Sequence, residues 1–121
     1  MKVFIIEDDP AYQQILKDTL EKEHFEVIIA SDGKQGISEI AKNRPDIVLL
    51  DIMLPGGMNG FDILEQLKAY TKTSKIPVII ITNLGSEEKV AKKIGASCYF
   101  VKSETSINQI VGKMKQLCNI S

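Results

Sequence analysis

The feature that most constrains this chain is a strict alternation of short apolar runs with longer amphipathic segments. The runs are rich in branched aliphatic residues, which is typical of strands buried on both faces of a sheet. They occupy residues 3–6, 27–30, 47–50, 78–82 and 98–101. After each run, apolar residues recur at spacings of three and four, which predicts a helix with one buried stripe. The stripes include Tyr12, Leu16 and Leu20; Ile37 and Ile40; Phe61, Leu64 and Leu67; Val90 and Ile94; and Ile107, Ile110 and Met114.

This alternation restricts the topology. Strands that each lead into a helix require right-handed parallel crossovers and a sheet covered by helices on both faces. Local signals agree: Asp9-Pro10 suits a cap followed by proline, residues 31–33 form a turn, residues 86–88 open the fourth helix and Gly95 ends it. The sequence therefore predicts a doubly wound α/β fold, in which the functional crevice lies at the carboxyl ends of the strands.

Composition excludes several classes of protein. The 121 residues suffice for one domain, and 15 basic against 16 acidic side chains give a net charge of -1, with no basic surface for nucleic acid. No apolar run approaches the ~20 residues of a membrane helix, and no signal-peptide pattern opens the chain. Cys98 and Cys118 lack metal-ligand or CxxC spacing and are interpreted as small core residues. We expect a cytoplasmic protein that contacts neither nucleic acid nor membrane.

Chemically reactive side chains gather where the predicted strands end. They are Glu7, Asp8 and Asp9 after the first strand, Asp51 after the third, Thr82 at the end of the fourth and Lys102 after the fifth. Taken singly, each is compatible with a solvated charge or a helix cap, and Asp9 before Pro10 favours the cap. Asp51 is more informative, because it lies between two apolar runs, where an unpartnered carboxylate is costly to desolvate. It therefore needs a cation nearby.

Several carboxylates at one sheet edge repel each other and call for a counter-ion. Mg²⁺ prefers oxygen ligands and is typically held by one or two carboxylates and a phosphate oxygen. A carboxylate in such a site can also attack phosphorus, while a hydroxyl and a lysine, here Thr82 and Lys102, stabilise the transferring group. The single His24 is interpreted as a surface residue, and neither GxGxxG nor GxxxxGK occurs.

Five motifs surround these positions in order. They are residues 3–10 (VFIIEDDP), 45–55 (PDIVLLDIMLP), 60–61 (GF), 76–82 (IPVIIIT), and 95–96 (GA) followed by 99–102 (YFVK). On these motifs the chain resembles, over essentially its whole length, the receiver domain of two-component response regulators. The resemblance implies one receiver domain over residues 1–121, with a flavodoxin-like (βα)5 fold and a five-stranded parallel sheet of order 2-1-3-4-5.

The resemblance also implies a role for each residue of an acidic metal site. Asp51 would be the phosphoacceptor. Asp8 would ligate Mg²⁺ directly, Glu7 would act through a metal-bound water, and Met53 would contribute its backbone carbonyl.

Three other positions match family residues that contact the phosphoryl group or report its presence. Thr82 would hydrogen-bond a phosphoryl oxygen, and Lys102 would pair with the phosphate. Tyr99 matches the switch aromatic, whose ring moves inward on phosphorylation; the alternative is an ordinary aromatic at the sheet edge.

The chain departs from the family pattern at three places. Ser103 replaces the usual proline after the lysine, so we expect either a trans bond with a rearranged loop or a strained cis bond, which costs about 3 kcal/mol before a non-proline residue. The loop at residues 56–59 is one residue longer than usual. Asn83 adds bulk where the family usually has a small residue. These departures concern kinetics and switching more than identity.

The leading hypothesis is a stand-alone receiver that takes a phosphoryl group from a sensor histidine kinase or a phosphotransfer protein. Because the receiver pattern fills the chain, we expect output by contacts with a protein target, through the face of the fourth helix, fifth strand and fifth helix. A monomer or a weak phosphorylation-dependent dimer is expected. The alternatives are a pseudo-receiver that needs no phosphate, a metal-dependent phosphatase, disfavoured by Met53 in place of a second acid, and an FMN-binding flavodoxin, which would need a phosphate loop.

Overall fold

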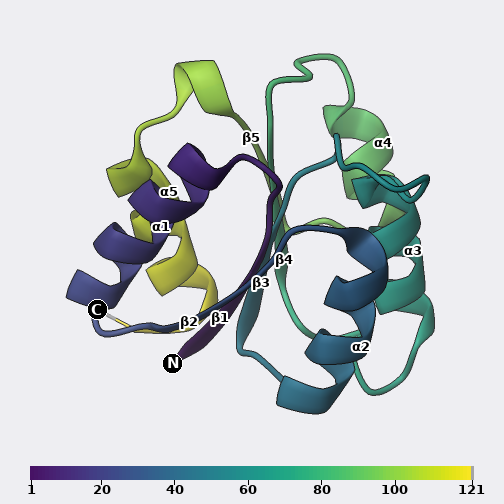
Figure 1. Ribbon diagram of the computed structural model, residues 1–121, viewed down its shortest axis with the longest axis horizontal. Helices are drawn as coiled ribbons and strands as arrows, with labels where there is room; N and C mark the ends of the chain where they lie inside the picture. The colour runs from purple at the N-terminus through teal and green to yellow at the C-terminus, as the bar shows by residue number, and fades with distance from the viewer. Residues whose placement is uncertain (121) are drawn as a thin grey trace.

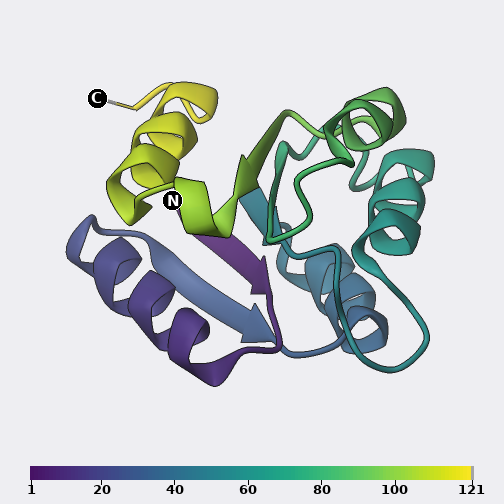
Figure 2. The same ribbon diagram turned by 90° about the horizontal axis from the view of Figure 1, so that it is seen from above.

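A five-stranded parallel sheet forms the centre of the computed structural model, which describes residues 1–120. The strand order is β2-β1-β3-β4-β5, as expected. Helices α1 and α5 cover one face, and α2, α3 and α4 cover the other (Figures 1 and 2). The strands are β1 (Lys2–Ile6), β2 (Glu26–Ala30), β3 (Ile47–Leu50), β4 (Val78–Thr82) and β5 (Cys98–Val101). The helices are α1 (Pro10–Lys22), α2 (Gly33–Asn43), α3 (Gly60–Ala69), α4 (Glu88–Ile94) and α5 (Ile107–Leu117), with a 3₁₀ turn η1 (Lys102–Glu104).

The helix ends follow most of the expected local signals. Asp9 caps α1 by accepting a hydrogen bond from the Ala11 amide at 3.0 Å, and Pro10 is the first helical residue. Gly95 ends α4 with φ at 134°. Residues 86–88 open α4 as expected, with Glu87 at the N-cap and Glu88 in the first turn, but no side chain makes a cap bond. Helix α4 therefore starts from a weak cap, since a capping side chain normally satisfies one free amide.

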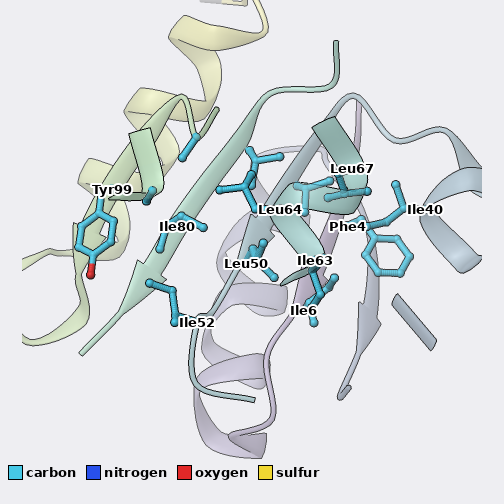
Figure 3. Close-up of a cluster of buried hydrophobic side chains, with 14 of the residues drawn as sticks. Phe4, Ile6, Ile40, Leu50, Ile52, Ile63, Leu64, Leu67, Ile80 and Tyr99 are labelled. Atoms are coloured by element: carbon cyan, nitrogen blue, oxygen red, sulfur yellow. The ribbon is translucent and has the colours of Figure 1, made fainter. Parts of the chain in front are cut away.

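The strands read as continuous apolar runs because both faces of the sheet are buried. Along β1, Phe4 and Ile6 pack beneath α2 and α3, whereas Val3 and Ile5 pack beneath α1 and α5. Figure 3 shows the first of these two clusters, which continues across the sheet to Tyr99. Since alternate residues of a strand point to opposite faces, the pleat determines which side of the sheet each strand-end residue meets.

The peptide bond between Lys102 and Ser103 is trans, so the expected alternative of a strained cis bond is wrong. Lys102 opens the turn η1 directly after β5. The Thr105 hydroxyl donates to the Val101 carbonyl at 2.8 Å and closes this turn. No helix within residues 1–120 is both long enough and apolar enough to cross a membrane.

The loop between β3 and α3 is held close to the sheet by Gly60. Its amide donates to the Ile52 carbonyl at 2.8 Å, and a Cβ atom here would lie 2.3 Å from the Asp51 carbonyl oxygen. Gly56 and Gly57 have φ angles of 86° and 79° and open space around them, so the longer loop uses the left-handed region that favours glycine. The start of α3 therefore sets the position of Asp51.

We expect Gly60→Ala to lower the free energy of unfolding by about 2 kcal/mol, because the added methyl group must displace backbone. Gly112→Ala is the matched control, since nothing lies within 4 Å of its added methyl and alanine favours the helix interior of α5. It should be neutral or stabilising by up to about 1 kcal/mol. Urea denaturation of both variants checks this, and equal effects would contradict the proposed contact.

Candidate functional site

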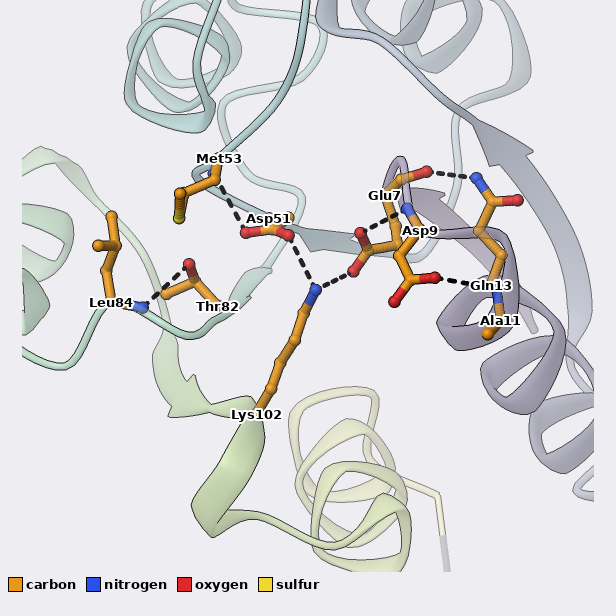
Figure 4. A network of polar contacts seen from close by, with 9 residues as sticks. All are labelled: Glu7, Asp9, Ala11, Gln13, Asp51, Met53, Thr82, Leu84 and Lys102. Carbon is orange, nitrogen blue, oxygen red and sulfur yellow. Dashed lines mark hydrogen bonds and ion pairs between the residues drawn. The ribbon is translucent and has the colours of Figure 1, made fainter.

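The side chain of Lys102 connects the carboxyl ends of β1, β3 and β5 (Figure 4). Its ammonium lies 2.9 Å from Oδ2 of Asp51 and also forms an ion pair with Oε1 of Glu7. Only 2% of Glu7 and 6% of Asp51 is exposed. Two buried carboxylates from strands that are neighbours in the sheet thus share one cation, which supplies the partner that the sequence required for Asp51.

The pleat of the sheet explains why these three residues meet. Glu7, Asp51 and Lys102 come two positions after Ile5, Leu49 and Phe100, all of which pack on the α1 and α5 side. Because side chains alternate with period two, the three strand-end residues continue toward that same side. An ion-pair network across β1, β3 and β5 therefore follows from the register.

Burial and charge shift the ionisation of this network. Burial raises the pKa of Glu7, and the negative charge of Asp51 adds to that rise against the opposing effects of Lys102 and the Asp9 amide. For Lys102, burial alone would lower the pKa, but its hydrogen bonds to Glu7 and Asp51 outweigh burial and raise it. The charged form of Lys102 is therefore favoured, whereas burial disfavours the charged form of Glu7.

The carboxylates of Glu7, Asp8 and Asp51 each offer an oxygen within 4.8 Å of the others. Asp8 is exposed, so this cluster opens to solvent on one side. Asp9 lies outside the cluster, since its side chain caps α1 and its amide donates to Glu7 Oε2 at 3.1 Å. Three carboxylates facing one ammonium leave an excess of negative charge, and hard oxygen donors suit Mg²⁺. The residues present fit such a cation.

Hydrogen bonds hold the two acidic loops in place. The Met53 amide donates to Asp51 Oδ1 at 3.1 Å, while the Met53 side chain is exposed. The Gln13 side-chain amide donates to the Glu7 carbonyl and, at 3.3 Å, to Ser31 Oγ. Gln13 was not among the expected site residues. Its bond to the Glu7 backbone fixes the chain next to Asp8.

Thr82 and Tyr99 point toward the other side of the sheet. Ile80 is opposite Tyr99 in the register, and Thr82 is two residues beyond Ile80, so all three face α3 and α4. The Leu84 amide donates to Thr82 Oγ1 at 3.4 Å, and the Tyr99 hydroxyl donates to the Leu84 carbonyl. Burial raises the pKa of Tyr99. The Leu84 backbone therefore connects the threonine to a buried ring beneath the β4–α4 loop.

Tyr12 is a second site neighbour, besides Gln13, that the sequence did not reveal. Its ring centroid lies 4.7 Å from the Lys102 ammonium. The periodicity placed Tyr12 correctly on the apolar stripe of α1, where it is partly buried, but no sequence signal couples it to Lys102 directly after β5. Asn83 and Ser103 are both exposed at the rim of the site.

An open groove runs beside Asp8 and Met53, between the β3–α3 and β4–α4 loops. Its volume is about 570 Å³, and apolar side chains, among them Leu54, Phe61 and Leu84, form much of its wall. The acidic cluster is thus reached along a surface that is largely apolar.

Comparison with known proteins gives consistent matches. Residues 3–115 match the family described as the response regulator receiver domain. PilH of Pseudomonas aeruginosa is 39% identical over 103 residues, which cover 84% of this chain and 84% of PilH. Sensory transduction protein RegX3 of Mycolicibacterium smegmatis is 40% identical over 83% of this chain, which spans only 43% of RegX3. The BeF3-activated N-terminal receiver domain of Klebsiella pneumoniae RstA has a TM-score of 0.89 at 28% identity, over 98% of each chain.

We expect Lys102→Met to lower the free energy of unfolding by about 3 kcal/mol at neutral pH without metal, because two buried carboxylates lose their cation. The loss should be small at acidic pH, where Glu7 is protonated, and grow as the pH rises through the pKa of Glu7, which burial raises above the ordinary 4.5. It should persist to pH 10.5, the ordinary pKa of lysine, and disappear above it, because the pKa of Lys102 is raised in the folded protein.

Urea denaturation in EDTA at several pH values measures this difference. Lys115→Met is the control, because Lys115 pairs with Glu23 at 2.5 Å in a much more exposed position, where solvent screens the pair and its contribution should be small. A pH-independent loss in Lys102→Met would show that the lysine stabilises the fold by packing alone.

Proposed function

Because the chain belongs to the receiver-domain family of response regulators, we propose that it is a phosphorylation-dependent switch whose phosphoacceptor is Asp51. The observation that carries the proposal is the environment of this carboxylate. It is buried, it accepts hydrogen bonds from the Met53 amide and Lys102, and it lies within reach of Glu7 and Asp8.

The proposed reaction is phosphoryl transfer from a phosphohistidine of a sensor kinase or phosphotransfer protein. One Asp51 carboxylate oxygen attacks phosphorus and forms a new O–P bond. The P–N bond breaks, and its electron pair leaves with the imidazole. Lys102 turns from the carboxylates toward the phosphoryl oxygens, and the Thr82 hydroxyl donates to one of them, so both offset developing charge.

The proposed reaction depends on Mg²⁺. Asp8 and Asp51 would ligate it directly, Glu7 would hold it through a water, and Met53 would offer its backbone carbonyl. When bound, the ion neutralises charge on the carboxylates and the incoming phosphoryl group. The close approach of three carboxylate oxygens supports this assignment.

We place the output of the switch on the face formed by α4, β5 and α5. Phosphorylation draws the Thr82 hydroxyl toward the phosphoryl group and away from the Leu84 amide. The β4–α4 loop then shifts, and its Leu84 carbonyl carries the hydrogen-bonded Tyr99 hydroxyl with it. The weak cap of α4 makes this helix easy to displace, which favours a population shift there. A protein partner that binds the shifted face would receive the signal.

We expect the wild-type protein to gain the mass of one phosphoryl group when incubated with acetyl phosphate and Mg²⁺, because Asp51 is its single acceptor. Asp51→Asn should gain none, and EDTA should abolish labelling of the wild type. Intact-mass spectrometry measures both. Asp18→Asn is the matched control, since Asp18 is an exposed carboxylate on α1. Equal labelling of wild type and Asp51→Asn would refute the acceptor, and no labelling at all would support the pseudo-receiver alternative.

The switch is tested without turnover by adding Mg²⁺ and beryllofluoride, a stable phosphoryl mimic. We expect amide chemical shifts to change at Leu84, along α4 and at Tyr99 in the wild type. In Thr82→Ala the mimic should still bind, but the changes at Leu84 and Tyr99 should shrink, because the hydroxyl that couples them is gone. Two-dimensional NMR measures this, and identical changes in both proteins would rule out coupling through Thr82.

A further inference from the structure

We propose that Tyr12 is a positioning residue that holds the Lys102 ammonium beside the phosphoryl group through the face of its ring. The proposal rests on the proposed function of Asp51 and assigns a residue of α1 to the same site. Tyr12 touches neither Asp51 nor the phosphoryl group in this scheme, so its effect acts through Lys102.

The geometry is that of a cation–π contact. The ammonium lies 4.7 Å from the ring centroid, within the range in which an aromatic face attracts a cation. Glu7 and Asp51 contact the same ammonium, and the Lys102 side chain is only 13% exposed. A largely desolvated cation gains more from an aromatic face than an exposed one.

The hydroxyl of Tyr12 shows that the ring, not a hydrogen bond, is the useful part of this side chain. Among the described residues, Tyr12 Oη is a buried polar atom without a hydrogen-bond partner. Burial also raises the pKa of Tyr12, so the ring stays a neutral phenol. An unpaired buried hydroxyl costs stability, and a leucine or phenylalanine would fill the stripe of α1 without that cost. Leucine, however, has no aromatic face and could not make the contact with the Lys102 ammonium.

The need for such a contact follows from the course of the reaction. Lys102 is attached at the start of a short 3₁₀ turn, and its ammonium sits at the end of a flexible four-carbon chain. When Asp51 becomes an acyl phosphate, it loses its carboxylate charge and holds the ammonium less strongly. The ring face is unchanged by that step. It keeps the ammonium at the strand ends while Lys102 changes partner from Asp51 to the phosphoryl oxygens.

The first test compares Tyr12→Phe, Tyr12→Leu and wild type in labelling by acetyl phosphate with Mg²⁺, where Asp51 forms the O–P bond and acetate leaves with the electron pair. Tyr12→Phe keeps the ring and should label within about twofold of wild type. Tyr12→Leu should label about three- to tenfold more slowly, the expected size of one cation–π contact. Phe25→Leu is the control, because it removes a buried ring from the same apolar layer but directly before β2, at the opposite edge of the sheet from the carboxyl ends of the strands.

A second test separates the charge of the ring face from its shape. Phenylalanine at position 12 carrying one, two or three fluorine atoms keeps nearly the same volume while the ring face becomes progressively less negative. We expect the labelling rate to fall in that order, whereas thermal stability should change little. Equal rates across the series would overturn the proposal and leave Tyr12 a packing residue.

A readout that needs no phosphate distinguishes failure of this proposal from failure of the proposed function. Because the Lys102 ammonium lies over the ring, protons on the adjacent carbon should show an upfield ring-current shift in wild type and Tyr12→Phe. The shift should vanish in Tyr12→Leu. If the wild type shows the shift but takes up no phosphate, the function of Asp51 is wrong while Tyr12 still positions Lys102. If the shift is absent from the wild type, Tyr12 does not position Lys102.

Discussion

The ammonium of Lys102 is the contact on which the site depends, because it makes burial of two carboxylates tolerable. Glu7 and Asp51 end neighbouring strands, and both are almost completely removed from water. Without a cation they would repel each other in a medium that screens poorly, and one of them would take up a proton. Lys102 reaches them from the residue directly after β5, across β4. The strands from β1 to β5 must therefore pair in the correct register before both carboxylates can stay ionised.

The pleat then divides the site between the two faces of the sheet. The ionic groups Glu7, Asp51 and Lys102 continue the side covered by α1 and α5. Thr82 and Tyr99 continue the side covered by α3 and α4. In the proposed function, acceptance of a phosphoryl group and its readout would thus occupy opposite sides of one sheet. They meet at the carboxyl edge of the sheet. Thr82 is the last residue of β4, and Asp51 follows the neighbouring strand β3.

Much of this arrangement could be predicted from the sequence, and the misses have physical causes. The five strands follow from the hydrophobic periodicity, and the edge that carries Glu7, Asp51 and Lys102 follows from the order of strands and helices along the chain. Both can be read from the sequence. The start of α4 at residues 86–88 was predicted, but the absence of a side-chain cap bond was not, because that bond depends on the geometry of the preceding loop. The contact of Tyr12 with Lys102 joins residues 90 positions apart. It depends on how α1 packs against the sheet, and no local sequence pattern specifies that packing.

The charges at the site explain why contacts that do not depend on ionisation matter there. With Glu7, Asp8 and Asp51 ionised, three negative charges face one ammonium. A divalent cation would balance the remaining two and release Lys102 from Glu7, and an incoming phosphoryl group would then attract the freed ammonium. Every ionic partner of Lys102 therefore changes in strength as the site fills. The ring of Tyr12 carries no net charge and loses none, so its attraction for the ammonium stays nearly constant through these states. In the proposed reaction Lys102 would change partners without leaving its place, and a contact with a neutral ring is one that would persist through that change.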